Sequence, residues 1–332
     1  MNRPVVLISL ESPHSFWQLS AAHERALSAA FPDVEFRTAT EEAVPRQLAE
    51  AHIYFGWRFE PSWLSGAPRL RWIASPAAGT DHLPVAEARS VGVALTRSFG
   101  FHGRPMAEHA MGMVLGFSRG LFMSRLAQRN RTWWKDDLAD EFFDLAGATM
   151  TIVGCGSIGE HVARVARAFG MYVIGVRRTP PVAAEGGITW MHTSAVHQAV
   201  AVADVVVDLL PATRGTDRFF DRDLFTAFKS RSLFLNLGRA ATVDQRALLA
   251  ALNTGHLRGA ALDVSDPRPL PARHPLRLHP RVLLTPKSST LSRTYMDDAV
   301  AFFADNLRRY LAGQPLNGLA EVPDARSPLV GG

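Results

Sequence analysis

The feature that most constrains the fold is the segment 151–170, which contains the pattern G-x-G-x-x-G. A short apolar run leads into Gly154, Gly156 and Gly159, and apolar residues then recur at helical spacing until Gly170. This order of strand, tight turn and helix is typical of a dinucleotide-binding unit. In such a unit the first glycine permits the turn, the second admits the pyrophosphate, and the third lets the helix pack on the strand. We therefore predict a dinucleotide site here.

The residues around this turn also indicate which dinucleotide is bound. The N-terminus of the predicted helix would direct backbone N–H groups at the phosphates. A second strand, 171–176, is followed by two arginines where an NAD-specific unit has Asp or Glu. Two guanidinium groups suit a 2′-phosphate, so we expect NADP(H). The predicted cofactor residues of this part are Gly154, Gly156, Ser157, Ile158, Gly159, Arg177, Arg178 and Thr179.

Cysteine content and apolar runs limit the class of protein. The single cysteine, Cys155, excludes an intrachain disulfide, which fits a reducing compartment. No apolar run is long enough for a membrane span or a signal peptide, so we expect a cytoplasmic protein that does not bind membranes. Cys155 lies inside the glycine turn, where a helix N-terminus can activate a thiol. A small space-filling role is the favoured interpretation.

Charge does not favour a nucleic-acid partner. The net charge is +5, but the basic residues are interleaved with acidic ones and form no cluster. Only three of the 36 basic residues are lysines, at positions 135, 229 and 287, so a lysine at a candidate site is unusual in this chain. We expect no metal site.

The length of 332 residues and the alternation of strand and helix patterns predict two α/β domains with parallel sheets. A helix is predicted over residues 15–30, another over 244–252 with Asp244 as its cap, and a closing helix over 292–312. Residues 125–141 read as an extension that makes an oligomer contact, and the tail after Pro323 as disordered. Further strands are predicted at 5–8, 53–55, 70–73, 93–95, 204–210, 232–237, 259–264 and 282–285.

Several polar residues follow the predicted strands. In an open α/β sheet, ligands bind beyond the carboxyl ends of the strands. Arg239, the segment 263–268 and Lys287 each stand at such an end. A guanidinium can bind a substrate carboxylate and polarise a neighbouring carbonyl, as hydride transfer to that carbonyl requires. Ala78 and Gly79 lie in a loop of small residues whose amides suit an anion, although an ordinary βα loop explains them equally well.

Read together, these motifs resemble the D-isomer-specific 2-hydroxyacid dehydrogenases over nearly the whole chain. The order of the matching segments is that of the family, and the Arg177-Arg178 pair is similar to its NADPH-dependent glyoxylate/hydroxypyruvate reductase branch. The segments are Gly79-Thr80-Asp81-His82-Leu83, Ala107-Glu108-His109, the glycine turn, Ala203-Asp204-Val205-Val206, Leu210-Pro211, residues 236–240, residues 259–264, Pro269-Leu270-Pro271, Thr285-Pro286 and residues 306–313.

This resemblance implies a fold and a reaction. It implies two Rossmann-like doubly wound domains, with an NADP-binding domain of residues 105–287 inserted into a flavodoxin-like substrate domain of residues 1–104 plus 288–332, and a hinge between them. It also implies a homodimer and reduction of a small 2-oxoacid to a 2-hydroxyacid. In this reading, amides near Ala78 and Gly79 bind the substrate carboxylate and Arg239 binds carboxylate and carbonyl. The residues implied on the nicotinamide side are Leu210, Pro211, Thr213 and Gly238, with Asp263 binding the carboxamide.

The chain departs from the family at two catalytic positions. Lys287 stands where the family has its catalytic histidine, and Arg268 stands where the family has the glutamate that supports it. Lys287 can act as the general acid if neighbouring cations such as Arg239 and Arg268 lower its pKa. Alternatively, the three cations bind a doubly anionic substrate, or the protein is a non-catalytic NADP(H)-binding protein with a regulatory role. The scarcity of lysine favours retained chemistry, with Arg239, Lys287 and Arg268 as the catalytic candidates.

Overall fold

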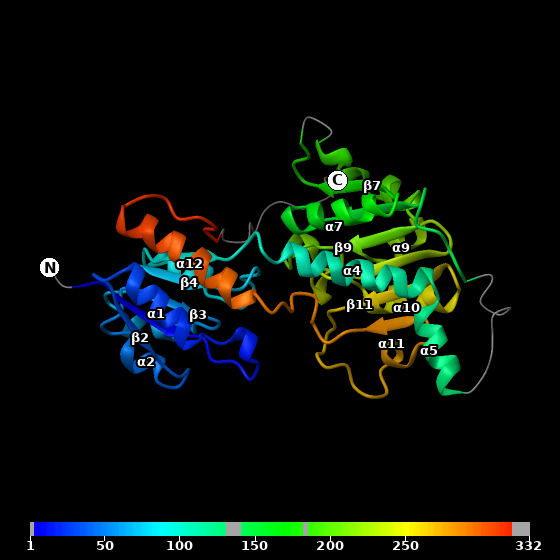
Figure 1. Ribbon diagram of the computed structural model, residues 1–332. Helices are drawn as coiled ribbons and strands as arrows, with labels where there is room; N and C mark the ends of the chain where they lie inside the picture. The colour runs from blue at the N-terminus through cyan, green and yellow to red at the C-terminus, as the bar shows by residue number, and fades with distance from the viewer. Residues whose placement is uncertain (1–2, 131–140, 182–184, 321–332) are drawn as a thin grey trace. The chain divides into compact units, whose positions relative to one another are not determined.

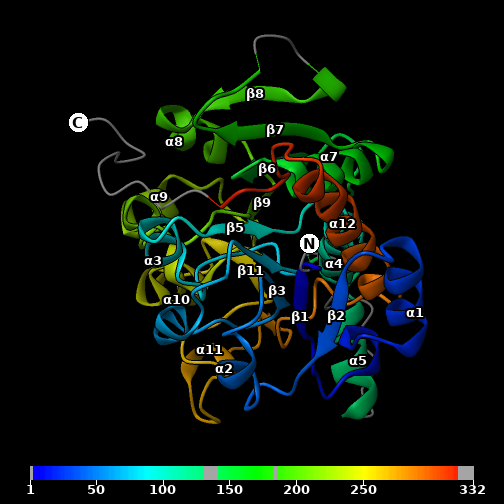
Figure 2. The same cartoon turned by 90° about the vertical axis from the view of Figure 1, so that its left-hand side faces the viewer.

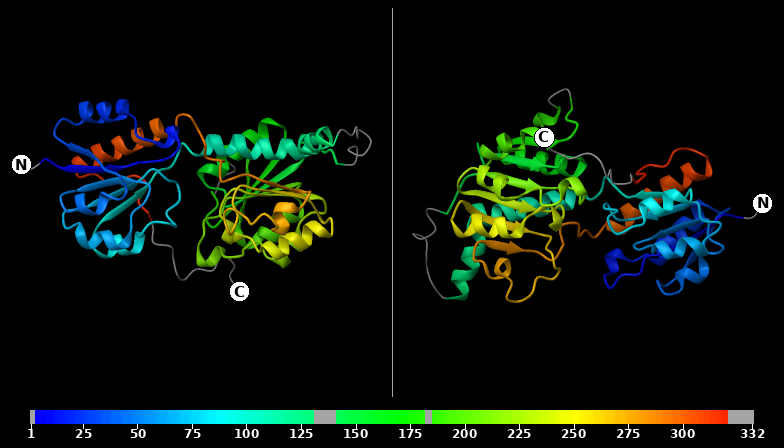
Figure 3. Two further views of the ribbon diagram at one scale, coloured as in Figure 1. Left: turned by 90° about the horizontal axis from the view of Figure 1, so that it is seen from below. Right: turned by 180° about the vertical axis from the view of Figure 1, so that it is seen from behind.

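In a computed structural model of the chain, residues 3–130, 141–181 and 185–320 are described. They form two compact units (Figure 1): the first combines residues of Met1–Phe101 and Leu291–Asp324, and the second comprises residues of His102–Thr290. The second unit is thus inserted into the chain of the first. Each unit contains one parallel sheet with helices on both faces (Figure 3), so the predicted fold class is confirmed. The extension at 125–141 falls partly, and the tail after Pro323 wholly, outside the described residues.

The first unit is built on a five-stranded sheet in the order β2-β1-β3-β4-β5, with all strand pairs parallel. This is the strand order of flavodoxin-like folds. Its strands are β1 (Val5–Ser9), β2 (Glu35–Thr38), β3 (Ile53–Gly56), β4 (Trp72–Ser75) and β5 (Ala94–Arg97). Its helices are η1 (Ser15–Trp17), α1 (Ala21–Ala30), α2 (Val44–Gln47), η2 (Pro61–Gly66), α3 (Val85–Ser90) and α12 (Tyr295–Leu311).

Both faces of this sheet are buried, which explains why its central strands read as continuous apolar runs. Val6 and Ile8 pack with α1 and α12, whereas Leu7 between them packs with α2 and α3. The same alternation holds along β3, where Ile53 and Phe55 face α12. The carboxyl-terminal helix α12 therefore completes a core that begins at the first strand.

The second unit is built on a seven-stranded parallel sheet in the order β12-β11-β10-β9-β6-β7-β8. Read from β8, this is the Rossmann order 3-2-1-4-5-6 with one further strand. The strands are β6 (Thr149–Val153), β7 (Tyr172–Arg177), β8 (Thr189–His192), β9 (Val205–Asp208), β10 (Ser232–Asn236), β11 (Leu257–Leu262) and β12 (Val282–Leu284). The helices are α4 (Gly103–Ser118), α5 (Leu121–Arg129), α7 (Ser157–Ala168), η3 (Glu185–Gly187), η4 (Thr193–Ala195), α8 (Val196–Ala201), η5 (Arg214–Thr216), α9 (Arg222–Ala227), η6 (Ala240–Thr242), α10 (Gln245–Asn253) and α11 (Pro275–Leu278).

Helices cover both faces of this sheet as well. Met150 and Ile152 of β6 pack with α4 and α7, and Val153 packs on the opposite side with α8, α9 and α10. Asp244 caps α10 as predicted, since its carboxylate accepts the backbone N–H of Arg246 at 2.8 Å. The strand order reverses between β6 and β9, which is where open α/β sheets bind their ligands.

Sequence patterns missed two strands, β2 and β8. Both lie at sheet edges, and Figure 2 shows β8 beyond β7 and β6. Neither strand contains a buried residue; in each, two half-buried residues stand between two exposed ones. An edge strand buries few side chains and so carries little of the apolar signal from which the central strands are predicted.

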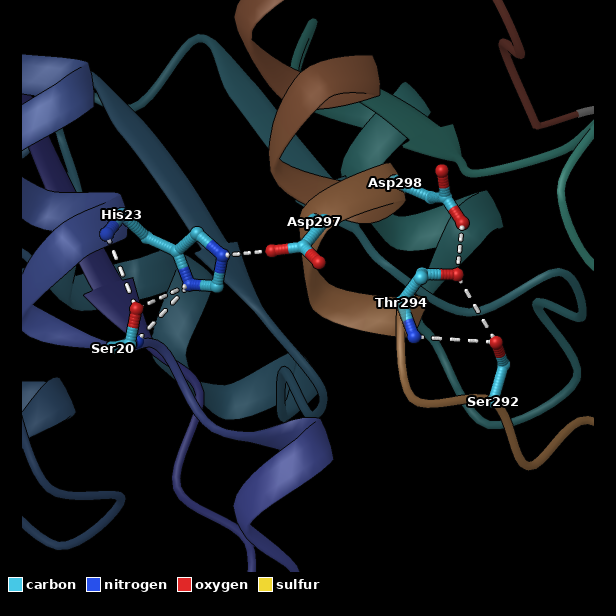
Figure 4. A network of polar contacts seen from close by, with 6 residues as sticks. All are labelled: Ser20, His23, Ser292, Thr294, Asp297 and Asp298. Carbon is cyan, nitrogen blue, oxygen red and sulfur yellow. Dashed lines mark hydrogen bonds and ion pairs between the residues drawn. The ribbon is translucent and has the colours of Figure 1, made fainter.

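The predicted helix over residues 15–30 is wrong at its start. Residues 15–17 form the short η1, and α1 begins only at Ala21. The reason is a capping box at Ser20 (Figure 4): its hydroxyl accepts the backbone N–H of His23 at 3.2 Å, and Nδ1 of His23 accepts the backbone N–H of Ser20 at 3.1 Å. The backbone of the capping residue Ser20 is extended, so a helix cannot continue through this position into α1.

His23 also connects the two ends of the first unit's chain. Because its Nδ1 accepts a hydrogen bond, its Nε2 carries the hydrogen and donates it to Asp297 of α12 at 2.8 Å (Figure 4). Ser20, His23 and Asp297 thus have the composition of a nucleophilic triad. The serine hydroxyl, however, accepts a helix N–H, so this network stabilises the packing of α1 on α12. No helix among the described residues is both long and apolar enough to cross a bilayer.

Ser20→Ala should lower the free energy of unfolding by about 1 kcal/mol, because the first turn of α1 loses its cap. The thermal midpoint should fall by roughly 2–4 °C, as monitored by circular dichroism. Ser20→Asn, which keeps a capping oxygen, is the matched control and should unfold close to the original protein. Equal stability of the alanine and asparagine variants would contradict the assigned role.

Candidate functional site

Most of the candidate residues lie at one edge of the seven-stranded sheet. Because every strand pair is parallel, the segments that follow β6, β7, β9, β10, β11 and β12 leave the sheet at the same edge. This edge therefore gathers residues that are up to 133 positions apart in the chain, between Gly154 and Lys287. In chain order they are the glycine turn, Arg177 to Thr179, the loop from Leu209 to Thr213, Gly238 with Arg239, Asp263 and Lys287.

The glycine turn after β6 requires at least two of its glycines. Gly154 has φ +82°, and a Cβ there would lie 2.9 Å from the carbonyl carbon of Leu209. A Cβ on Gly159 would lie 2.9 Å from Sγ of Cys155, so a side chain would push α7 away from the strand. These constraints agree with the roles expected of the first and third glycines.

The start of α7 offers unpaired donors for an anion. Gly156 is the N-cap, is exposed, and has open space where a Cβ would stand. The N–H groups of Ser157, Ile158 and Gly159 belong to the first turn, where a helix provides no intrahelical partner, and they donate to no other described residue. This arrangement fits the pyrophosphate of a dinucleotide.

Cys155 fills space behind the turn. It is fully buried, and burial raises the pKa of its thiol to about 12. The nearby carboxylate of Glu160 adds to this effect, and Arg177 opposes it. The thiol therefore stays protonated at neutral pH, which supports the space-filling interpretation.

The two arginines after β7 differ in their surroundings. Nη1 of Arg177 lies 3.6 Å from a carboxylate oxygen of Glu160, and its guanidinium lies 5.5 Å from the ring centre of Trp190. Arg178 and Thr179 are exposed. Sequence patterns did not reveal that Glu160 and Trp190 hold Arg177, because both contacts join residues from separate elements. Arg178 is therefore the arginine better suited to meet a ligand.

The loop after β9 and the turn after β10 touch through their backbones. A Cβ on Gly238 would lie 2.7 Å from the carbonyl oxygen of Leu210. The Leu209–Thr213 loop is held at Pro211, whose carbonyl accepts the Thr216 hydroxyl at 2.6 Å, and the Thr213 N–H donates to the same hydroxyl at 2.8 Å. Because only a hydrogen atom fits between Gly238 and Leu210, the turn after β10 and the loop after β9 are fixed relative to each other.

Arg239 stands on a turn with an internal set of hydrogen bonds. Asn236 accepts the Gly238 N–H at 3.0 Å and donates to the Arg239 carbonyl at 2.9 Å. The Thr242 hydroxyl lies 2.6 Å from the same carbonyl. The half-buried guanidinium contacts the Gly238 carbonyl at 3.0 Å through Nη1. Sequence reasoning identified Arg239 but missed Asn236, Thr242 and the buried Asp208, which contacts Thr242.

Asp263 is buried and holds the segment that carries Lys287. Its carboxylate accepts the Thr285 hydroxyl at 2.6 Å and the N–H groups of Ser288 and Ser289 at 2.8 and 3.0 Å. Burial opposes its ionisation, but hydrogen bonds from Ser289, Thr285 and Ser288 outweigh that effect and lower its pKa. The Asp263 carboxylate thus uses most of its hydrogen-bonding capacity within the protein.

His109 of α4 joins this network, which sequence reasoning missed. Its Nε2 lies 3.2 Å from the Thr285 hydroxyl and 3.6 Å from the Asp263 carboxylate. Because Thr285 gives its hydrogen to Asp263, Nε2 of His109 must carry a hydrogen. Burial lowers the pKa of His109, although Asp263 opposes this, so the net effect favours the uncharged imidazole.

Lys287 has an unusual backbone conformation. Its φ is +55°, in the left-handed region, which costs a residue other than glycine roughly 1–2 kcal/mol. Its N–H donates to the Asp263 carbonyl at 2.9 Å, and its side chain is exposed. The hydrogen bonds of Asp263 on both sides of Lys287 maintain this conformation. Strain held in this way is common at functional sites.

Two further groups of predicted residues are Arg268 and the pair Ala78 and Gly79. Arg268 is exposed in the segment after β11 and has no hydrogen-bond or ion-pair partner among the described residues. Ala78 and Gly79 belong to the first unit, in the loop after β4. There the Ala78 carbonyl accepts Nη1 of Arg97 at 3.4 Å, while the N–H groups of Ala78 and Gly79 donate to no described residue. These two amides are therefore available to an anion.

Comparison with known proteins identifies the family. The sequence profile for the NAD-binding domain of D-isomer-specific 2-hydroxyacid dehydrogenases matches residues 111–289. Glyoxylate/hydroxypyruvate reductase B of Yersinia pestis is 31% identical over 271 residues, which cover 80% of this chain and 82% of that protein. Crystal structures of two bacterial proteins are similar over nearly the whole chain.

The first is a D-isomer-specific 2-hydroxyacid dehydrogenase family protein from Aeromonas salmonicida, 33% identical, with a TM-score of 0.81 and coverage of 97% of this chain and 99% of that one. The second is a D-isomer-specific 2-hydroxyacid dehydrogenase from Xanthobacter autotrophicus in complex with NADPH and MES. It is 26% identical, with a TM-score of 0.81 and coverage of 95% and 98%. The family resemblance of the motifs is thus confirmed, and the chain belongs to the D-isomer-specific 2-hydroxyacid dehydrogenases, NAD(P)-dependent oxidoreductases that act on 2-hydroxyacids.

Proposed function

We propose that the protein catalyses the NADPH-dependent reduction of a small 2-oxoacid to the 2-hydroxyacid. The observation that carries this proposal is the gathering of the glycine turn, Arg239 and Lys287 at the carboxyl edge of one parallel sheet. The names of the relatives, which include glyoxylate/hydroxypyruvate reductases, support the substrate class. The NADPH complex of the Xanthobacter relative supports the cofactor.

The geometry of the edge and the family resemblance support an assignment of the residues that would hold the cofactor. The free N–H groups of Ser157, Ile158 and Gly159 would bind the pyrophosphate, and Arg178 would bind the 2′-phosphate with help from Arg177 and Thr179. Leu210, Pro211, Thr213 and Gly238 would line the nicotinamide side. When bound, NADPH supplies the hydride. Because the Asp263 carboxylate already accepts hydrogen bonds from Thr285, Ser288 and Ser289, its main role would be to hold the Lys287 segment, with little capacity left for the carboxamide.

We assign the catalytic roles to two cationic side chains. Arg239 would bind the substrate carboxylate and polarise the carbonyl, so that negative charge developing on the carbonyl oxygen is stabilised. Lys287 would give that oxygen its proton. In the first unit, the N–H groups of Ala78 and Gly79 would bind the carboxylate. The carbonyl carbon thus gains a hydride and the oxygen a proton. Arg268 is exposed, and we assign it to binding a second anionic group of a substrate.

The reaction class is tested by NADPH consumption with glyoxylate, hydroxypyruvate, oxaloacetate and phosphonopyruvate. We expect turnover with at least one of these compounds. A preference for oxaloacetate or phosphonopyruvate over glyoxylate that disappears in Arg268→Gln would support binding of a second anionic group by that arginine. Tight NADPH binding without turnover of any compound would favour a non-catalytic NADP(H)-binding protein instead.

Cofactor choice is tested by fluorescence titration with NADPH and NADH. The protein should bind NADPH more tightly by about 1–3 kcal/mol, roughly 5- to 150-fold, because a 2′-phosphate gains charge-assisted hydrogen bonds. Arg178→Ala should remove most of this preference and leave NADH affinity unchanged. Arg46→Ala, which removes an exposed arginine of the first unit, is the control for the general effect of charge. Equal affinity of the original protein for both nucleotides would refute the assignment.

The role of Lys287 is tested by Lys287→Met, which keeps a similar stem but has no proton to give. The chemical step, measured in single turnovers, should slow by roughly 10²- to 10⁴-fold, while NADPH affinity changes little. Lys229→Met is the matched control, because Lys229 forms an ion pair with Asp204 at 2.6 Å, and both residues precede their strands, at the amino-terminal edge of the sheet. A Lys287→Met enzyme with the original single-turnover rate would show that the proton comes from another source.

The pH dependence gives a second test of the same residue. A lysine acid must be protonated, so the rate should fall as pH rises through its titration. Lys287→His should shift this fall to lower pH, because the ordinary pKa of imidazole is about 6.5. Adding Arg268→Glu to Lys287→His would rebuild the family's acid pair and should raise the activity of the histidine variant.

A further inference from the structure

Asp208 is a fully buried carboxyl that the proposed reaction does not use. It is the last residue of β9 and is 0% exposed. Its register partners are Val153 on β6 and Asn236 on β10, both uncharged. A carboxyl in such a place is costly to ionise, so its hydrogen-bond partners decide what it does.

The side chain of Asp208 connects the two segments that carry the proposed nicotinamide and substrate contacts. Oδ1 accepts the N–H of Leu210 at 2.8 Å, and Oδ2 contacts the hydroxyl of Thr242. The Thr242 hydroxyl also lies 2.6 Å from the carbonyl oxygen of Arg239. One chain of contacts therefore runs from the Leu210 loop through Asp208 and Thr242 to the backbone of Arg239.

The number of hydrogens available to this series of contacts depends on the protonation of Asp208. The Thr242 hydroxyl has one hydrogen and faces two acceptors, the Asp208 carboxyl and the Arg239 carbonyl. If Asp208 is ionised, Thr242 donates to it, and two oxygens then face each other at 2.6 Å without a hydrogen between them. If Asp208 is protonated, it donates to Thr242, and Thr242 donates to the Arg239 carbonyl. Only the protonated form satisfies both contacts.

We propose that Asp208 is a positioning residue that, when protonated, holds Arg239 and the Leu210 loop in the arrangement required for hydride transfer. The proposal rests on the function proposed above. Ionisation would turn the Thr242 hydroxyl away from Arg239, whose carbonyl would keep only the donors of Asn236 and of the Thr242 N–H. The arginine would then lose part of its support.

Electrostatics make this change relevant near neutral pH. Burial raises the pKa of Asp208 to about 7; the hydrogen bonds from Thr242 and Leu210 and the charge of Arg239 oppose it. Arg239 is the charged side chain that acts on the carboxyl, and the groups that face it from β6, β10, the Leu210 loop and Thr242 are uncharged. The hydrogen bonds from Asp208 to Thr242 and from Thr242 to the Arg239 carbonyl should thus be intact below about pH 7 and lost as pH rises above it.

The test compares Asp208→Asn, Asp208→Ala and Thr242→Val. Asparagine mimics the protonated acid, because its oxygen can accept from Leu210 and its amide can donate to Thr242. At pH 6 the asparagine variant should keep kcat within about twofold, and at pH 8.5 it should exceed the original enzyme several-fold. Asp208→Ala and Thr242→Val should lower kcat about tenfold or more at pH 6, with little change in the Kd for NADPH.

An unchanged pH profile in Asp208→Asn, or an asparagine variant as impaired as the alanine variant, would overturn the proposal. A fall of rate due to Lys287 would persist in Asp208→Asn, so the two ionisations are distinguishable. The ¹³C resonance of the Asp208 carboxyl, assigned by its loss in Asp208→Asn, provides a readout independent of activity. It should titrate near pH 7, and a carboxyl that is already ionised at pH 5 would also refute the proposal. If the carboxyl titrates as expected but no 2-oxoacid is reduced, only the proposed function fails.

Discussion

The site depends on close backbone contact where the strand order of the second unit reverses. Gly154 after β6 and Gly238 after β10 both approach the Leu209–Leu210 backbone so closely that a Cβ on either would lie 2.9 Å or less from its atoms. Three segments that follow three different strands are therefore held in one fixed arrangement. This arrangement sets the positions of the free N–H groups of α7, the Leu210 loop and Arg239. A side chain at either glycine would disturb the start of α7 and Arg239 together.

Asp263 plays a comparable part at the other end of the edge. A single buried carboxylate holds Thr285, Ser288 and Ser289, and thereby a lysine in a left-handed conformation. In this family the residue after Thr-Pro is expected to be a histidine supported by glutamate. Here the hydrogen bonds of Asp263 with Thr285, Ser288 and Ser289 hold the backbone on both sides of position 287. Such a backbone arrangement can hold different side chains at position 287.

The sequence predicted those features that depend on local pattern. The glycine turn, the central strands and the Asp244 cap each have a signature within a few residues, and the structure contains them. The strands β2 and β8 were missed because edge strands lack buried runs. The predicted helix over 15–30 was wrong because Ser20 was not recognised as a cap. Contacts between distant elements, such as Glu160 with Arg177, His109 with Thr285 and Asp208 with Thr242, have no local signature. The sequence pointed to Arg239 and Lys287 as candidates because of their place after strands, whereas the groups that position them have no such signal.

The buried thiol of Cys155 has a practical consequence. It is the only cysteine in the chain, it is fully buried behind Gly159, and its pKa is raised. Its Sγ lies in the packing between α7 and β6, so a thiol reagent reaches it when this packing opens. The rate of labelling of the native protein therefore reports how often the glycine turn opens. Cys155 is thus a natural probe of local opening at the predicted dinucleotide site. It needs no engineered label, and no other thiol competes for the reagent.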